Sequence, residues 1–370
     1  MDNQRLLIWA FFAMMAWITY QTWVQDYAPT PTQPVAEQPA DTISPPGAIE
    51  GSDDLPEISD VPVGATEALP ATPGDIQDEA TKSTAPTIRV TTDVFSIQIS
   101  TQGGTLLGAT LSKYPVEKDR PDELVRLLDA SGRTYAVIES GVRAAAGGAE
   151  ATHLQAFTAA RSNYELGDAD ELIVPLTWTD ASGVTVEKRY RFTRGGYAIG
   201  LEQEVNNGSA TEWRGAEYVR IKRHSHEVER SMFNVDSYSF DGPIIYDGDK
   251  SEKLKRDDLL SDGKVEYTSQ QGWFGSIQHH FLRAVVPPPG VDYKYDVAVV
   301  GEVATSSAIR RSLVSVPPGA SETFSTTLFV GPKLQQQLEE IDESLKLTVD
   351  YGWLTIISQP LFWLLAFVYD

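Results

Sequence analysis

The spacing of hydrophobic and polar positions divides the chain into segments of different kinds. Residues 6–24 form one apolar run without a charged residue. An α-helix rises about 1.5 Å per residue, so this run is close to the length that crosses a bilayer core. Residues 25–86 show no apolar period. From Thr87 onward apolar and polar residues alternate, which predicts half-buried β-strands.

The alternation is clearest on either side of Arg194-Gly195-Gly196, a turn of the kind that joins two strands. One face of this hairpin is apolar and is formed by Val184, Val186, Tyr190, Phe192, Tyr197, Ile199, Leu201 and Val205. Further strands are predicted at 95–99, 216–222, 293–303, 309–316 and 323–330. Many strands joined by Gly, Pro and Asn turns predict an antiparallel β-sandwich over residues 87–346.

Two segments carry a helical spacing instead. Residues 273–285 are the first candidate. The second covers residues 332–346, where Pro332 suits a helix start and an apolar stripe follows at Leu334, Leu338, Ile341 and Leu345. So short a stripe favours a helix that docks on the sandwich over a coiled coil.

Charge sets the expected orientation of the first apolar run. Arg5 precedes it and no further Lys or Arg occurs before Lys82, whereas acidic residues are frequent after it. The positive-inside bias therefore predicts a cytoplasmic segment at residues 1–5, with the chain after residue 24 on the outer side. The alternative is a cleaved signal peptide, which Asp2 and the lack of a small-x-small site disfavour. The predicted membrane anchor includes Arg5, Leu6, Leu7, Ile8, Trp9, Phe11, Phe12, Trp17 and Trp23.

Residues 347–370 become apolar again, and 353–369 carry no charge. Pro360 would remove a backbone hydrogen bond in mid-span, and polar residues cluster beside it. Two interpretations stay open: a helix that lies in the outer interface of the membrane, or one that crosses the bilayer. We favour the interfacial helix, with membrane contacts from Trp353, Leu354, Pro360, Phe362, Trp363, Phe367 and Tyr369. The lack of a polar tail after Asp370 suggests a part of a longer protein.

Composition narrows the functional classes. Residues 25–86 are rich in Pro and acidic residues and lack aromatics after Tyr27. Because such a segment cannot bury enough apolar surface to offset the entropy cost of ordering, we expect it to be a disordered tether. The net charge of −22 argues against nucleic acid as a partner. The chain has no cysteine, which excludes disulfides and thiol catalysis.

His224-Ser225-His226 is the strongest candidate for chemistry. On a strand both imidazoles would point to one face, as a metal pair requires. No third ligand follows at matching spacing, so a solvated strand edge is expected. His279-His280 lies in an apolar context that favours a packing role. The sequence predicts no catalytic residue, no metal and no cofactor, and indicates a binding or structural module.

Several short segments carry a family resemblance. They are 1–5 before the apolar run, 92–94, 103–104, 114–115, 179–183 and 194–198, and most specifically 347–354 followed by 357–362. With these segments in this order over its whole length, the chain resembles the YidC membrane protein insertases of Gram-negative bacteria. One departure is that 362–367 lacks the Lys that this family often carries there.

The resemblance implies a large periplasmic β-supersandwich, similar to sugar mutarotase folds, on a protein of the bacterial inner membrane. It implies a non-enzymatic role in inserting and folding inner-membrane proteins, alone or with the Sec translocon. The implied partners are nascent inner-membrane proteins, the Sec translocon with its accessory subunits, and the lipid bilayer. The insertion groove of the family lies in later helices, so the resemblance assigns none of its residues to this chain.

Two alternatives remain at this point. One is a membrane-anchored periplasmic domain that binds carbohydrate or acts like a mutarotase, with His224 and His226 in a cleft of the sandwich. The other is a passive scaffold that docks translocon subunits.

Overall fold

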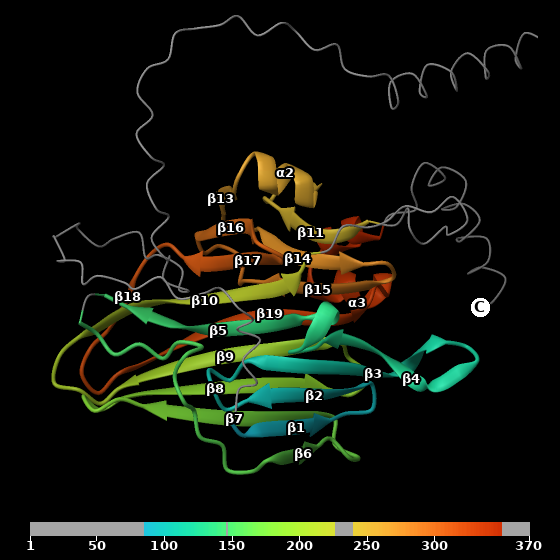
Figure 1. Ribbon diagram of the computed structural model, residues 1–370. Helices are drawn as coiled ribbons and strands as arrows, with labels where there is room; N and C mark the ends of the chain where they lie inside the picture. Colours follow the sequence, from blue (N-terminus) through green and yellow to red (C-terminus); the bar gives the residue numbers. More distant parts are fainter. Residues whose placement is uncertain (1–84, 146, 226–239, 350–370) are drawn as a thin grey trace, which may run out of the picture. The chain divides into compact units, whose positions relative to one another are not determined.

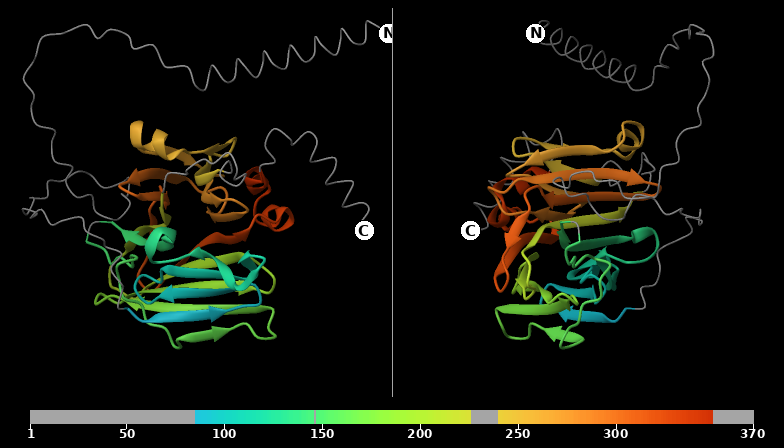
Figure 2. Two further views of the ribbon diagram at one scale, coloured as in Figure 1. Left: turned by 45° about the vertical axis from the view of Figure 1, so that its right-hand side comes forward. Right: turned by 90° about the vertical axis from the view of Figure 1, so that its left-hand side faces the viewer.

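The computed structural model describes residues 85–145, 147–225 and 240–349, all within one unit that spans residues 53–370. Two large β-sheets face each other as layers (Figures 1 and 2). The larger sheet has 11 strands. Nine of them follow one another in a continuous order, and β18 and β4 are attached outside this path, to β10 and β3. Along that path they are β13 (Val265–Ser269), β16 (Tyr293–Val300), β17 (Val303–Arg310), β10 (Trp213–His224), β5 (Ala136–Ala144), β3 (Leu106–Glu117), β2 (Phe95–Ser100), β1 (Thr87–Thr91) and β6 (Asn163–Glu165), with β18 (Val314–Val316) and β4 (Arg120–Leu128).

The smaller sheet has 8 strands. In spatial order they are β12 (Ser251–Lys253), β11 (Asp241–Tyr246), β14 (Trp273–Gln278), β15 (Phe281–Val286), β19 (Ser321–Pro332), β9 (Ala198–Asn207), β8 (Val184–Thr193) and β7 (Glu171–Thr179). Apart from the parallel pair β1–β6, the pairings of the described strands are antiparallel. Short helices complete the description: η1 (Gly132–Thr134), α2 (Arg256–Ser261), α3 (Gln335–Ile341) and η3 (Glu343–Thr348). The prediction of a mainly β, antiparallel sandwich is confirmed.

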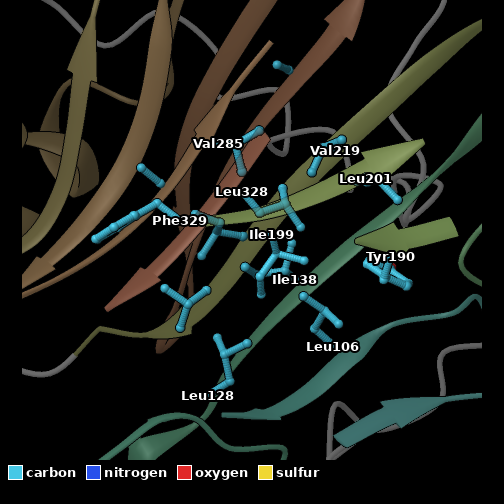
Figure 3. Close-up of a cluster of buried hydrophobic side chains, with 14 of the residues drawn as sticks. Leu106, Leu128, Ile138, Tyr190, Ile199, Leu201, Val219, Val285, Leu328 and Phe329 are labelled. Carbon is cyan, nitrogen blue, oxygen red and sulfur yellow. The ribbon is translucent and has the colours of Figure 1, made fainter. Parts of the chain in front are cut away.

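The core lies between the two sheets. The β8–β9 hairpin supplies much of it, and the residues that the alternation placed on its apolar face are all buried. Figure 3 shows how they meet the other layer, with Ile199 near Ile138 and Leu201 near Val219. The turn after β2 needs glycine, because Gly103 and Gly104 both have φ near +65° (67° and 65°).

The two helices predicted from the sequence differ from the structure, the first in type and the second in extent. Residues 273–285 form the hairpin β14–β15 instead of a helix, since nearly every residue of β14 is buried and an apolar run without alternation hides the strand period. His279 turns this hairpin with φ of 50°. Where one helix was expected over 332–346, β19 continues to Pro332, and α3 and η3 are separated by an extended Asp342.

The edge strand β7 is protected along its outer side. Thr177 exchanges two backbone hydrogen bonds of 2.8 Å with Thr158 beyond the sheet edge. Because backbone direction alternates along a strand, Pro175 faces the same outer edge, where it offers no N–H. The outward hydrogen-bonding ladder of β7 is therefore interrupted.

Candidate functional site: a groove beside the C-terminal helices

A groove of about 770 Å³ lies on the outer face of the smaller sheet. Its floor comes from β9 and β19, where Gly200, Glu202 and Thr327 alternate with residues that point into the core. Its walls are the Pro287-Pro288-Pro289 loop after β15 and the η3 segment. Segments from four distant parts of the sequence thus meet at one site.

The η3 wall is fixed to the sandwich by a buried polar contact. Trp273 is fully buried on β14, and its Nε1 donates to Ser344 Oγ at 2.7 Å. Asp342 Oδ1 accepts from Ser344 N at 2.8 Å and so caps the short helix. Leu345 and Thr348 are fully buried on the same side. The helix that borders the groove is therefore docked by side-chain burial as well as by chain connection.

Aromatic and charged groups line different parts of the groove. Tyr246 stacks on Trp273 with ring centroids 5.7 Å apart and planes 20° from parallel. In the η3 wall, Lys346 Nζ lies 2.6 Å from Glu343 Oε1, which raises the pKa of Lys346 and lowers that of Glu343. The arrangement suits binding of an extended segment with both apolar and polar groups.

Glu202 links the groove to a ladder of ion pairs across the outer face of the smaller sheet. Its carboxylate lies 3.1 Å from Arg189 Nε and 3.3 Å from Arg191 Nη2. Arg189 also pairs with Glu204 at 2.7 Å, and Arg191 pairs with Glu171 on β7. The outer face of β7, β8 and β9 is thus charged but largely neutralised by its own pairs.

Lys188 and Glu217 are ionisable side chains inside the core that the sequence did not single out. Lys188 is fully buried, and its Nζ donates to Gly103 O at 2.6 Å and to the backbone and hydroxyl oxygens of Ser140 at 2.9 Å. Burial lowers the pKa of Lys188 to about 7. Glu217 on β10 accepts from Tyr293 Oη, and burial raises its pKa to about 7. Both groups join the two layers, Glu217 by accepting from Thr326 Oγ1 on β19 at 3.4 Å, and neither lies in the groove.

The histidines occupy separate places. His224 Nε2 lies 3.1 Å from Glu302 Oε2, while His226 falls outside the described residues. His153, which the sequence did not single out, is 4% exposed and contacts Tyr218 Oη through Nδ1 at 2.6 Å. Within the described ranges, no group of three His, Asp or Glu side chains is arranged to hold a metal ion.

The predicted membrane segments lie outside the residues that the structure describes. Residues 6–24, with the proposed anchor side chains, and 353–369, with the proposed interfacial ones, are not among the residues described. In the ranges that are, no helix has both the length and the apolar character needed to cross a bilayer.

Comparison with known proteins identifies the family. The family model of the YidC periplasmic domain matches residues 87–364. The chain belongs to this family. The match covers both sheets, the groove and its helices, which agrees with the resemblance noted in the sequence.

Relatives of this family align over nearly the whole chain. The protein of Methylococcus capsulatus is 37% identical and that of Thioalkalivibrio sulfidiphilus 36% identical, over 99% and 100% of this chain. Both are named "Membrane protein insertase YidC". The chain spans 64% and 66% of their lengths. About a third of each relative's length therefore lies outside the match.

Solved structures resemble the sandwich distantly. A galactose mutarotase-like protein from Lactobacillus casei has a TM-score of 0.44 at 12% identity, covering 66% of this chain and 99% of its own. The Slr1438 protein of Synechocystis has a TM-score of 0.43 at 10% identity, covering 72% and 100%.

Proposed function

We propose that this chain is the anchor and periplasmic portion of a membrane protein insertase and chaperone of the bacterial inner membrane. The observation that carries the proposal is the family match over residues 87–364, joined by relatives named as insertases along 99–100% of the chain. The role is non-enzymatic: the protein provides surfaces for other membrane proteins. Its substrates would be nascent inner-membrane proteins, handled alone or with the Sec translocon and its accessory subunits.

Within that role, the groove is the proposed contact site of the periplasmic domain. Its support is physical: an open volume of about 770 Å³ whose lining includes Tyr246, which stacks on the buried Trp273, and the ion pair of Lys346 with Glu343. Such a lining accepts segments that carry both apolar and polar residues. Because η3 is docked through Trp273 and Ser344, the groove is preformed.

The proposed topology places residues 1–5 in the cytoplasm, residues 6–24 across the membrane and the sandwich in the periplasm, with 347–370 along the outer interface. The chain has no cysteine, so single cysteines report position without background. We expect a cysteine at exposed Ser182 to react with an impermeant thiol reagent in intact cells, and one at Asn3 to react only after permeabilisation. Equal labelling of Asn3 in intact cells would contradict this orientation.

The interfacial segment has its own labelling test. Cysteines at Leu354, Gln359 and Ala366 should label from outside without a steady gradient if the helix lies flat. Labelling that falls from Leu354 to Ala366, with Asp370 reached only from the cytoplasm, would show that the segment spans the membrane.

Insertion itself is tested with a chimera. This chain is joined to the part of the Methylococcus capsulatus relative that it does not cover, reconstituted in proteoliposomes and supplied with a small single-span membrane protein. We expect protease-protected substrate, at a level above that of a matched chimera whose residues 87–349 are replaced by an unrelated periplasmic domain. A folded chimera that inserts no more substrate than empty liposomes would refute the proposal.

A further inference from the structure

The groove beside the C-terminal helices has a lining that is richer in hydrogen-bond acceptors than in donors. Its floor is the face of the β9–β19 pair and not a sheet edge, so an occupant is recognised by side chains and not by strand addition. One wall consists of three successive prolines, which have no backbone N–H to donate. Among the described residues of the lining, the charged side chains are three carboxylates and one ammonium group: Glu202, Asp342, Glu343 and Lys346.

Asp342 gives the groove a carboxylate that is not balanced by a cation. Lys346 Nζ lies 2.6 Å from Glu343 Oε1, so these two charges cancel. Asp342 is half-buried, and its Oδ1 accepts from the backbone N–H and the hydroxyl of Ser344. In the part of the chain that the structure describes, no Lys or Arg side chain forms an ion pair with Asp342. Because both bonds are made to Oδ1, Oδ2 is left for a ligand.

The sheet face next to the groove carries charge of the same sign. Although each guanidinium of the ion-pair ladder is paired, the carboxylates outnumber the guanidinium groups. The members are Arg189 and Arg191 with Glu171, Glu187, Glu202 and Glu204. Glu187 and Glu204 are direct cross-strand partners, so two like charges lie side by side and share Arg189. Since Glu202 belongs to both the ladder and the groove floor, the negative charge continues into the groove.

The apolar part of the lining restricts the ligand further. Leu347 in η3 is 44% exposed, and it lines the groove together with the half-buried Val286, Ile341 and Tyr246. Anionic lipid headgroups, nucleic acids and acidic polypeptides would be repelled by the carboxylates. A free inorganic cation would leave the apolar residues uncovered. A polypeptide segment that carries Lys or Arg among apolar residues fits both parts of the lining.

We propose that the groove binds an extended polypeptide segment in which a Lys or Arg side chain stands next to apolar residues. The basic side chain pairs with Asp342, and its apolar neighbours pack on Leu347 and Ile341. This inference rests on the proposed function, in which the groove is the contact site of the domain. It adds the sign of the charge that the bound segment carries.

Binding is measured with the full chain in phosphatidylcholine nanodiscs and three fluorescent peptides of equal length. One peptide repeats Val, Thr and Lys, and the other two have Gln or Glu in place of Lys. We expect the Lys peptide to bind saturably, about tenfold or more tightly than the Glu peptide at low ionic strength, and more weakly as salt is added. Equal binding of the three peptides, or equal binding of the Lys peptide to nanodiscs without protein, would overturn the proposal.

Asp342→Asn tests the carboxylate, because asparagine keeps an oxygen acceptor for Ser344 and removes the charge. The affinity for the Lys peptide should fall about threefold to fivefold, the scale of one partly exposed ion pair, while binding of the Gln peptide stays the same. Asp119→Asn is the matched control, since Asp119 is exposed on the turn between β3 and β4 and does not line the groove. An unchanged affinity for the Lys peptide in Asp342→Asn would refute this role.

The position of the bound peptide is tested without changing any charge. The chain has no cysteine, so a photo-crosslinker can be attached at Leu347→Cys in the groove or at Leu154→Cys, a leucine of similar exposure outside the lining. The Lys peptide should cross-link from Leu347→Cys and not from Leu154→Cys, and equal cross-linking would contradict the site. The insertion assay with the chimera tests the proposed function separately. If the chimera inserts its substrate while the peptides bind without regard to charge, only the present inference fails.

Discussion

Lys188 on β8 and Gln203 on β9 are cross-strand partners on the inner face of the smaller sheet, and both are fully buried. Each stands in a row of apolar neighbours: Val186 and Tyr190 flank Lys188, and Leu201 and Val205 flank Gln203. The lysine has three oxygen acceptors from the other layer and from the β2–β3 turn, whereas neither side-chain polar atom of Gln203 has a hydrogen-bond partner in the described part of the chain. The apolar core between the sheets is thus interrupted by polar side chains at this cross-strand pair.

Lys188 should make stability rise with pH above neutrality. Its pKa in the folded protein is lowered to about 7, below the ordinary 10.5, so the unfolded chain binds more protons between these values. The free energy of unfolding therefore increases from about pH 7 towards 10, with a slope of up to about 1.4 kcal/mol per pH unit. Denaturant unfolding at several pH values measures this slope. It should disappear in Lys188→Met and persist in Lys113→Met, which changes an exposed lysine.

Glu217 should act in the opposite direction below neutrality. Burial raises its folded pKa to about 7 from 4.5, so the folded protein binds more protons between these values and loses stability as the pH rises through them. Gln in place of Glu217 keeps an oxygen acceptor for Tyr293 Oη and removes the titration. We expect Glu217→Gln to gain stability over wild type at pH 8 relative to pH 5, by circular dichroism melting. A constant difference between the two proteins across this range would show that Glu217 does not titrate there.

Ser344 should control how firmly η3 is docked. Alanine at this position leaves the buried Trp273 Nε1 without its acceptor, at a cost of about 1–3 kcal/mol. Hydrogen exchange should accelerate at residues 343–348 before it changes elsewhere in the sandwich. Lys346→Ala is the control, because its pair with Glu343 is exposed and contributes little. Exchange in Ser344→Ala that matches wild type would contradict this role for the contact.

Gly103 should not tolerate a side chain. Its φ of 67° is unfavourable for other residues, and a Cβ there would overlap the backbone of His153. Gly103→Ala should lower the free energy of unfolding by more than about 2 kcal/mol. Gly195→Ala tests φ strain alone, since Gly195 has φ of 70° but nothing near its Cβ position. Equal losses in the two variants would show that the overlap with His153 contributes nothing.

Alternation along the chain predicted the inner face of the β8–β9 hairpin but not its polar members. Lys188 and Gln203 occupy the same faces as Val186 and Leu201, yet their side chains are of types that usually stay in water. Lys188 is buried because Gly103 and Ser140, 85 and 48 residues away in sequence, provide oxygens at its ammonium group. Such a partner depends on tertiary structure, and spacing within one strand carries no signal for it.

The groove could not be predicted from the sequence, because its lining residues also come together only in the tertiary structure. Its lining combines Gly200 and Glu202, Pro287 to Pro289, Thr327 and the segment 343–347. Each of these is an ordinary strand or loop residue, and only the order of β15, β19 and β9 in the sheet brings them together. The hairpin β14–β15 was missed because burial on both faces removes the alternation that identifies a strand.

Pro175 affects how other proteins can interact with the exposed edge of the smaller sheet. If the domain works among unfolded membrane proteins, as proposed, extended chains repeatedly approach its outermost strand. An open sheet edge is a template on which such chains can add as extra strands, the route by which transient contact becomes aggregation. With no donor at Pro175 and Thr177 already bonded to Thr158, an arriving strand meets an interrupted ladder at this edge. An extended chain that contacts β7 can therefore dissociate without adding to the sheet.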